Sequence, residues 1–294
     1  MPVDKPILVM GAGGHFGRFI APQLIKRGAT VRGMVHHDQA EAIARSTGVK
    51  DIARADLRDE SAVRRALNGV GGVFYIPPKF LPDEAEIGVR FVQLAAEAGV
   101  DRFVLSGVMY PFITDMRNHR SKLPVELALV KSGMDFTILQ PTNIMQSTGA
   151  FFWDRVLETG EYVEPWAQDK KSCYVDYRDV AEVAAKALTE DGLQNGTFEL
   201  TAAGTISRND IVAMMSEALG RTITTRTMRI ADWNAQNMPS DPPFLREAFI
   251  DIDLFYSRYG FPGGNDLVLR TILGREPRTM RDYIRELATT SAGI

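Results

Sequence analysis

A cluster of glycines follows the first apolar run of the chain. Gly11, Gly13, Gly14 and Gly17 come directly after Ile7–Met10, and a helical stripe of apolar residues begins behind them. Glycines in this context permit a tight turn, close approach of backbone N–H groups to a pyrophosphate, and close packing of helix on strand. The pattern predicts a dinucleotide-binding turn; the alternative is a glycine-rich turn that binds no ligand. We expect the turn to contact a cofactor through Gly11, Gly13, Gly14, His15, Phe16 and Gly17.

Strand-like and helix-like segments alternate through the first two hundred residues. The helical segments carry apolar residues at i, i+3 and i+4, as at Phe91, Leu94, Ala95 and Ala98. This alternation is typical of an α/β fold with a parallel sheet covered by helices on both faces. Seven strands suit a doubly wound dinucleotide-binding sheet extended by one strand. The expected strands are 7–10, 30–36, 50–55, 73–76, 102–106, 136–139 and 197–200.

The pattern changes after about residue 201. The segment from Ser207 to Asp210 resembles a capping box, and helical patterns lie on both sides of the proline-rich stretch 237–244. We therefore expect a small, mainly helical cap that binds substrate. The predicted doubly wound domain comprises residues 1–149 and 173–203, and the cap comprises residues 150–172 and 204–294.

Composition and charge exclude several classes of protein. The chain has 294 residues, 45% of them hydrophobic, and its net charge of −3 offers no basic surface for nucleic acid. With one cysteine, Cys173, and no paired histidine spacing, we expect neither a disulfide within the chain nor a metal site. The apolar run near the N-terminus is too short for a signal peptide or a membrane span. We expect a cytoplasmic monomer or homodimer that acts on a small molecule, without nucleic acid or membrane.

The glycine spacing G-x-x-G-x-x-G of Gly11, Gly14 and Gly17, with a series of later segments, resembles the NmrA-like group of atypical short-chain dehydrogenases/reductases. The resemblance covers nearly all of the chain and implies an NAD(P)-binding Rossmann fold and an NAD(P)H-dependent reductase of small aromatic, quinone-like or conjugated carbonyl compounds. The group also includes non-catalytic redox sensors, and relatives of the extended type include nucleotide-sugar epimerases and isomerases, so both functions stay open. The similar segments are 55–57, 73–78, 100–106, 129–141, 175–181 and 273–279.

The residues that end the second strand bear on the choice of cofactor, because a carboxylate there favours NAD and a basic group favours NADP. This chain has His36, His37 and Asp38, whereas NADP-using members of the group typically carry arginine near position 36. Histidine is largely neutral near pH 7, so the pair would hold a 2′-phosphate weakly; the alternative is a solvated strand end. The resemblance favours NADP(H), with NAD(H) as the alternative. It also places Asp56 and Leu57 at the adenine, and Ile76, Pro77, Pro78, Ser106, Gly107, Lys122, Pro141 and Asn143 along the rest of the cofactor.

Most short-chain dehydrogenases use Tyr-x-x-x-Lys, in which the lysine lowers the tyrosine pKa for proton transfer. Here Asn118 occupies the place of the tyrosine and Lys122 that of the lysine. The resemblance implies that Lys122 binds the ribose hydroxyls or acts as acid or base; the alternative is a solvated lysine before a helix. His119 and Tyr110 are the alternative proton donors. If the acceptor is a quinone or a conjugated cation, water can supply the proton and the protein mainly aligns the reactants.

Aromatic and apolar residues predict a pocket for a flat substrate. The alternative is that most of them belong to the hydrophobic core between sheet and cap. The candidates are Phe80, Tyr110, Met145, Phe152, Trp153 and Trp166.

Overall fold

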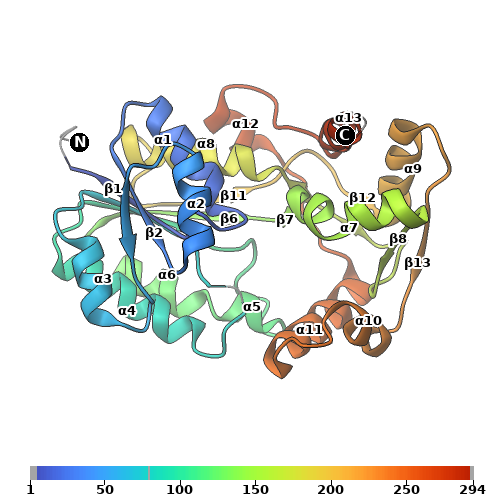
Figure 1. Ribbon diagram of the computed structural model, residues 1–294, viewed down its shortest axis with the longest axis horizontal. Coiled ribbons are helices and arrows are strands. Elements are labelled where there is room, and N and C mark those ends of the chain that lie inside the picture. The colour runs from blue at the N-terminus through green and yellow to red at the C-terminus, as the bar shows by residue number, and fades with distance from the viewer. Residues whose placement is uncertain (1–4, 79, 292–294) are drawn as a thin grey trace. The chain divides into compact units, whose positions relative to one another are not determined.

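The computed structural model describes residues 5–78 and 80–291 (Figure 1). The chain divides into two compact units. The first unit consists of Met1–Phe112, His119–Gln140 and Arg178–Glu199, and the second of Ile113–Asn118, Pro141–Tyr177 and Leu200–Ile294.

A seven-stranded sheet in the order β11-β6-β5-β4-β1-β2-β3 forms the centre of the first unit. The neighbouring pairs from β3 to β6 are all parallel. All seven expected strands are present, which confirms the doubly wound α/β prediction. The strands are β1 (Ile7–Met10), β2 (Val31–Val35), β3 (Asp51–Arg54), β4 (Gly72–Tyr75), β5 (Arg102–Ser106), β6 (Asp135–Pro141) and β11 (Gly196–Leu200).

Helices cover both faces of this sheet (Figure 1). The helices α1, α2 and α8 lie on one face, and α3, α4 and α6 lie on the other. Helix α3 begins where the Asp59 side chain caps it by accepting a hydrogen bond from the Ala62 N–H at 3.0 Å. It packs on the sheet through Val63 and Leu67, which are fully buried. The helices are α1 (Ile20–Lys26), preceded by a 3₁₀ turn at Gly17–Phe19, α2 (Asp38–Ser46), α3 (Glu60–Leu67), α4 (Glu84–Glu97), α6 (Leu123–Val130) and α8 (Tyr177–Thr189), with the short α5 (Arg117–Arg120) before α6.

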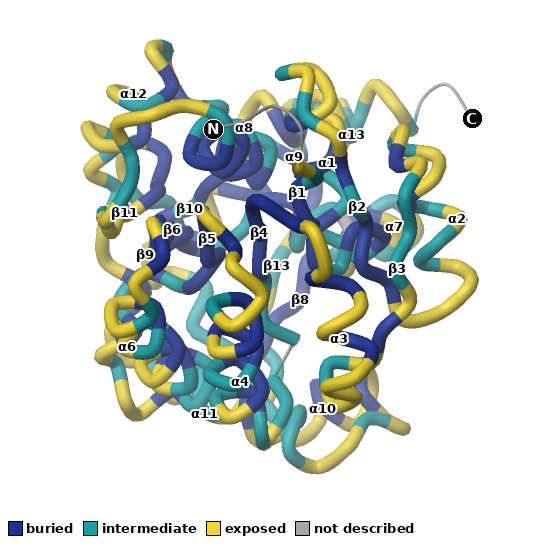
Figure 2. Tube along the Cα trace, turned by 90° about the vertical axis from the view of Figure 1, so that its left-hand side faces the viewer, coloured by how far each residue is buried: buried dark blue, intermediate teal, exposed yellow. Residues whose placement is uncertain are grey.

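The core of the first unit lies against the central strands. Strands β1, β4 and β5 are buried along their whole length, as Figure 2 shows. Tyr75, Phe91 and Phe103 pack with ring centroids 4.8–6.2 Å apart. Helices α4 and α6 pack closely here, because a Cβ at Gly88 would lie 2.5 Å from Cγ2 of Val125. This packing brings the first turns of α4 and α6 together.

The second unit is mainly helical and contains three small two-stranded sheets. Its helix α9 begins at the predicted capping box, where Ser207 and Asp210 bond each other's backbone N–H groups. Helices α7, α9 and α13 pack around a separate hydrophobic core. The helices are α7 (Met145–Thr159), α9 (Arg208–Leu219), α10 (Ile230–Asn237), α11 (Pro243–Tyr259), α12 (Leu267–Leu273) and α13 (Met280–Ser291). The paired strands are β7 (Asn143–Ile144) with β10 (Tyr174–Val175), β9 (Lys171–Ser172) with β12 (Ile206–Ser207), and β8 (Glu161–Glu164) with β13 (Thr224–Thr227).

Candidate active site

The glycine-rich turn leaves the sheet at the end of β1. Gly11 has a φ of +66°, in the left-handed region that favours glycine, and its carbonyl accepts a hydrogen bond from the Gly14 N–H at 2.8 Å. The Ala12 N–H donates to the Met34 carbonyl at 3.3 Å and ties the turn to β2. The result is a tight turn between strand and helix, as the sequence predicts.

Two other glycines of the turn are required by close backbone packing. A Cβ at Gly13 would lie within 3.0 Å of three backbone atoms of Ala40 in α2, and a Cβ at Gly17 would lie 2.7 Å from the carbonyl carbon of Gly11. Side chains are therefore excluded from both positions. A tight glycine-rich turn of this kind, between a strand and a helical segment, can bind the pyrophosphate of a dinucleotide through its backbone N–H groups.

Several predicted cofactor residues come together at one edge of the sheet. Strand β1 lies between β2 and β4, so the chain changes direction of winding there, and ligands of such sheets bind at this point. A Cβ at Gly11 would lie 3.7 Å from Cγ2 of Ile76, and the Gly107 N–H donates to the Leu139 carbonyl at 2.8 Å. Ser106, which ends β5, is paired with Leu139 of β6. The ends of β1, β4, β5 and β6 thus form one continuous edge.

The end of this edge that carries the residues expected at the adenine is polar. Nε2 of His36 lies 3.6 Å from Oδ2 of Asp56, and both side chains are at least half-exposed. The ring of His37 has a structural task, since its Nδ1 accepts from the Ala40 N–H at 3.1 Å and caps α2. Arg54, which the sequence analysis did not single out, is the basic residue at the end of β3, where its guanidinium pairs with Asp38 and with Glu41.

Lys122 is buried, which makes the solvated-lysine alternative wrong. Its side chain is 8% exposed, and Nζ donates to the carboxylate of Glu84 at the start of α4. Ser121 Oγ donates to the same Glu84 oxygen at 2.8 Å and lies 3.3 Å from Nζ. Burial lowers the pKa of the Lys122 ammonium below its ordinary value, and the charge of Glu84 opposes this shift. The lysine is therefore held in one position as half of a buried ion pair.

Of the other two candidate proton donors, His119 interacts with the charge of Lys122, and Tyr110 contacts His119 through its backbone. Nδ1 of His119 lies 3.0 Å from the carbonyl oxygen of Tyr110, and burial lowers the pKa of His119 to about 4. Tyr110 has a φ of +59°, a strained conformation for a residue with a side chain. Its ring packs 5.5 Å from that of Phe112, which is 68% exposed. His119 is thus neutral at pH 7, and the backbone of Tyr110 helps to hold it.

Asn143 has defined partners within the second unit. Its Oδ1 accepts from the hydroxyl of Tyr256 at 2.7 Å, and its Nδ2 donates to the carbonyl of Cys173 at 3.2 Å. The Tyr256 ring lies 5.7 Å from that of Trp166. Both the oxygen and the nitrogen of the Asn143 side-chain amide are therefore hydrogen-bonded, so the orientation of the side chain is fixed. Tyr256 carries no motif that sequence reasoning could have used to find it.

The predicted substrate residues divide into two groups. Met145, Phe152 and Trp153 pack in the hydrophobic core of the second unit, where Trp153 Nε1 also donates to Ser291 Oγ at 2.8 Å. Phe80, Tyr110 and Trp166 are half-buried. Met145 and Trp153 are buried, whereas Phe152, like the second group, keeps part of its surface exposed.

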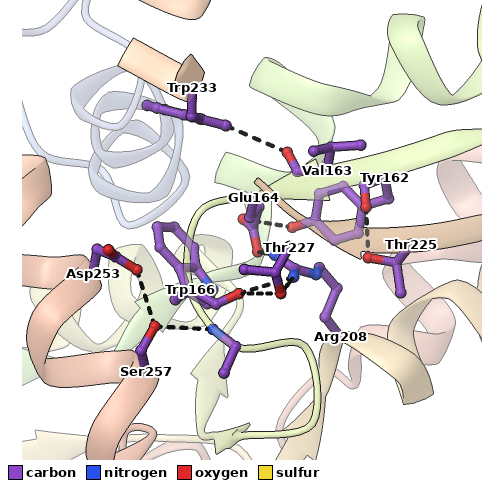
Figure 3. A network of polar contacts seen from close by, with 11 residues as sticks. Tyr162, Val163, Glu164, Trp166, Arg208, Thr225, Thr227, Trp233, Asp253 and Ser257 are labelled. Atoms are coloured by element: carbon purple, nitrogen blue, oxygen red, sulfur yellow. Dashed lines mark hydrogen bonds and ion pairs between the residues drawn. The ribbon is translucent and has the colours of Figure 1, made fainter. Parts of the chain in front are cut away.

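A buried polar network holds the segment that carries Trp166 (Figure 3). Arg208 pairs with Glu164 at 3.4 Å and donates to the Trp166 carbonyl at 2.9 Å, and Thr227 Oγ1 lies 3.2 Å from the same carbonyl oxygen. Burial raises the pKa of Glu164, and the charge of Arg208 opposes that shift. The Tyr162 hydroxyl completes the network by donating to Glu164 at 2.9 Å.

Residues 5–78 and 80–291 hold neither a cluster of metal ligands nor a helix that could span a membrane. No group of three or more histidine, cysteine, aspartate or glutamate side chains there could hold a metal ion. Across the same residues, none of the helices combines the length and the apolar character needed to span a membrane.

Comparison with known proteins agrees with this geometry. The chain is 30% identical over 218 residues to an NAD(P)H azoreductase from Xenophilus azovorans, covering 74% of this chain and 75% of that protein. It is 29% identical over 289 residues to a (4-alkanoyl-5-oxo-2,5-dihydrofuran-3-yl)methyl phosphate reductase from Streptomyces griseus, covering 97% and 99% of the two chains. An NADPH-dependent quinone oxidoreductase from Escherichia coli, solved with NADPH, shares the fold with a TM-score of 0.81 at 21% identity, over 96% and 99% of the chains. The profile of the NmrA-like family matches residues 3–244, and the protein therefore belongs to the NmrA-like family.

Proposed function

We propose that the protein is an NAD(P)H-dependent oxidoreductase that reduces a small, electron-poor conjugated acceptor by hydride transfer. The observation that carries the proposal is the glycine-rich turn, whose positions 13 and 17 leave no space for a side chain at the switch point of the sheet. The names of the relatives support it, because an azo compound, a quinone and an unsaturated oxo-dihydrofuran are all conjugated acceptors. Such acceptors take up a hydride without a strong acid beside them.

The cofactor would lie along the edge formed by the strand ends. The turn from Gly11 to Gly17 would hold the pyrophosphate through backbone N–H groups. Ile76, Pro77, Pro78, Ser106 and Gly107 would line its middle, Asp56 and Leu57 its adenine, and Pro141 with Asn143 its nicotinamide end. Bound reduced nicotinamide supplies the hydride. We propose NADPH as the preferred nucleotide, with His36 beside the 2′-phosphate.

Lys122 is the group that we assign to hold the proton. An asparagine at position 118 has no acidic proton to give, and His119, with a pKa of about 4, carries no extra proton at pH 7. The ammonium of Lys122 can release a proton from Nζ to the reduced product and take one back from water. Ser121 and Glu84 keep that nitrogen in place during the exchange.

We propose that residues 150–172 and 204–294, the predicted cap, bind substrate. The aromatic candidates for contact with the acceptor are Phe80, Tyr110 and Trp166. A cytoplasmic location and a monomeric or homodimeric state stay predictions.

The test is to titrate the protein with NADPH and NADH, and then to follow the absorbance of reduced nicotinamide after adding a naphthoquinone, an azo dye or an unsaturated lactone. Oxidation that requires the protein supports the proposal and ranks the two nucleotides. Tight binding without oxidation by any acceptor would favour a redox sensor, and binding with conversion of a sugar nucleotide but no net oxidation would favour an epimerase. If neither nucleotide binds, the proposal fails.

A further inference from the structure

The first unit contains a buried carboxylate, Glu84, that was not among the predicted site residues. Glu84 is the first residue of α4, and its side chain is only 2% exposed. A single oxygen, Oε1, accepts from both Lys122 Nζ and Ser121 Oγ. Burying an ion pair costs free energy that packing alone would not require, since apolar side chains of similar size commonly serve as well. The pair therefore calls for a functional explanation.

Among the described residues, titratable groups that interact with Lys122 or with its partner Glu84 lie on α4, α5, α6 and β4. Glu126 in the first turn of α6 is half-buried; its Oε1 accepts from Gln140 Nε2 at 3.0 Å, and its charge favours the protonated form of Lys122. His119 on α5 is neutral at pH 7. Tyr75 on β4 keeps its hydroxyl proton, because burial and the charge of Glu84 raise the pKa of Tyr75. Glu84 on α4 is the carboxylate in direct contact with Nζ.

We propose that Glu84 is the positioning residue of Lys122: its carboxylate fixes the ε-amino group at one place and keeps it protonated for use at the reacting centre. The inference deepens the proposed function and rests on it for the role of Lys122 in turnover. Burial alone would drive Lys122 towards its neutral form, and the contact with Glu84 is the main opposing influence. Glu84 would thus decide whether Lys122 has a proton to give at the working pH.

A glutamine at position 84 isolates this effect. Glu84→Gln keeps the size of the side chain and one acceptor oxygen but removes its charge. An opposite charge at this range shifts the pKa of its partner by about 1–3 pH units. The Lys122 pKa should fall by that amount in the variant. Glu86→Gln is the matched control, because Glu86 lies in the same first turn of α4 and is exposed.

The primary measurement needs no cofactor. The chain has nine lysines, so protein labelled with carbon-13 at the lysine ε-carbons gives few NMR signals, and the signal lost in Lys122→Met identifies Lys122. We expect its titration midpoint to be about 1–3 pH units lower in Glu84→Gln than in the wild type and unchanged in Glu86→Gln. An unchanged midpoint in Glu84→Gln would overturn the inference.

Kinetics supply the second arm. With an acceptor that the wild type reduces, kcat should fall at alkaline pH, where Lys122 loses its proton. In Glu84→Gln this fall should occur at a pH about 1–3 units lower than in the wild type. KM for the nucleotide should change less than threefold. Glu84→Asp should restore part of the wild-type profile. Equal loss of kcat at every pH would contradict a role through the Lys122 proton. If the wild type oxidises no nucleotide, the proposed function fails, while the titration still decides whether Glu84 controls Lys122.

A folding defect in Glu84→Gln would be resolved by pairing the substitutions. In the double variant Glu84→Gln with Lys122→Met, no buried charge is left without a partner. If Glu84 acts through Lys122, the double variant should resist urea better than Glu84→Gln alone. If the loss of stability of the double variant, relative to the wild type, equals the sum of the losses of the two single variants, Glu84 acts independently of Lys122 and the inference fails.

Discussion

Gly13 provides a direct test of the architecture of the cofactor turn. In Gly13→Ala the added Cβ would lie 2.7 Å from Cα and 2.5 Å from the carbonyl carbon of Ala40, and closer still to its oxygen. Non-bonded heavy atoms essentially never lie within 3.0 Å of a Cβ atom. The atoms met here belong to the backbone, which cannot rotate aside as a side chain can. The shortest of these contacts is 1.8 Å, so the turn and the first turn of α2 must separate by about 1.2 Å to bring it to 3.0 Å. Overpacking of this kind costs about 1–3 kcal/mol.

Two measurements check this expectation, with Gly14→Ala as the control. A Cβ at Gly14 would meet only the Gly11 carbonyl oxygen at 3.0 Å, so a small shift relieves it. Urea unfolding followed by circular dichroism should show a loss of about 2 kcal/mol for Gly13→Ala and under about 1 kcal/mol for Gly14→Ala. Affinity for NADPH should fall at least about tenfold in Gly13→Ala, which corresponds to 1.4 kcal/mol of binding energy, because the N–H groups of the turn are displaced.

Particular results would refute the reasoning. Wild-type stability of Gly13→Ala would mean that the turn does not approach Ala40 as closely as described. Gly13→Ala and Gly14→Ala could instead lose equal NADPH affinity without differing in stability. That result would mean that the added methyl groups clash with the bound nucleotide and not with Ala40. Unchanged NADPH affinity in Gly13→Ala would remove the turn from the cofactor site.

Three further outcomes are expected. Arg208→Met should lower the free energy of unfolding by about 3–5 kcal/mol, because it leaves Glu164 buried without its cation, and adding Glu164→Leu should recover most of the loss in urea titrations. His119 binds its proton more weakly in the folded protein, so its contribution to stability is complete above pH 6.5 and is lost as the pH falls towards 4. That loss approaches about 3 kcal/mol, and stability measured against pH should fall less steeply in His119→Gln than in the wild type. Tyr256→Phe should cost about 0.5–1.5 kcal/mol, because it removes the hydrogen bond to Asn143, as thermal unfolding would show.

The fold was largely predictable because its strands are buried parallel strands. Such strands produce short apolar runs such as Ile7–Met10 and Arg102–Ser106, and the helices between them carry a clear apolar periodicity. The capping box at Ser207 could likewise be predicted, since it depends on residues three positions apart. Predictions that rest on local spacing succeed where tertiary contacts reinforce the same choice.

The surroundings of the predicted site residues could not be predicted in the same way. Glu84 and Lys122 are 38 positions apart, and an acidic residue in the first turn of a helix is ordinarily explained by the helix dipole and solvent. His37 was expected at the cofactor, but a histidine that caps α2 through Nδ1 has the same sequence signature as one at a solvated strand end. Pairings of this kind depend on how α4 packs on α6 and on where each strand ends.

The asparagine at position 118 and the buried Lys122 pair bear on one question, the source of the proton. In Tyr-x-x-x-Lys enzymes the lysine charge serves mainly to lower the pKa of the tyrosine. Without that tyrosine, Lys122 has no phenol whose pKa its charge could lower. Lys122 is instead shielded from solvent and held by Glu84, which is the arrangement required to maintain a charge in a water-poor site. The ion pair therefore favours a lysine that itself carries the proton for the reaction over one that only orients the cofactor.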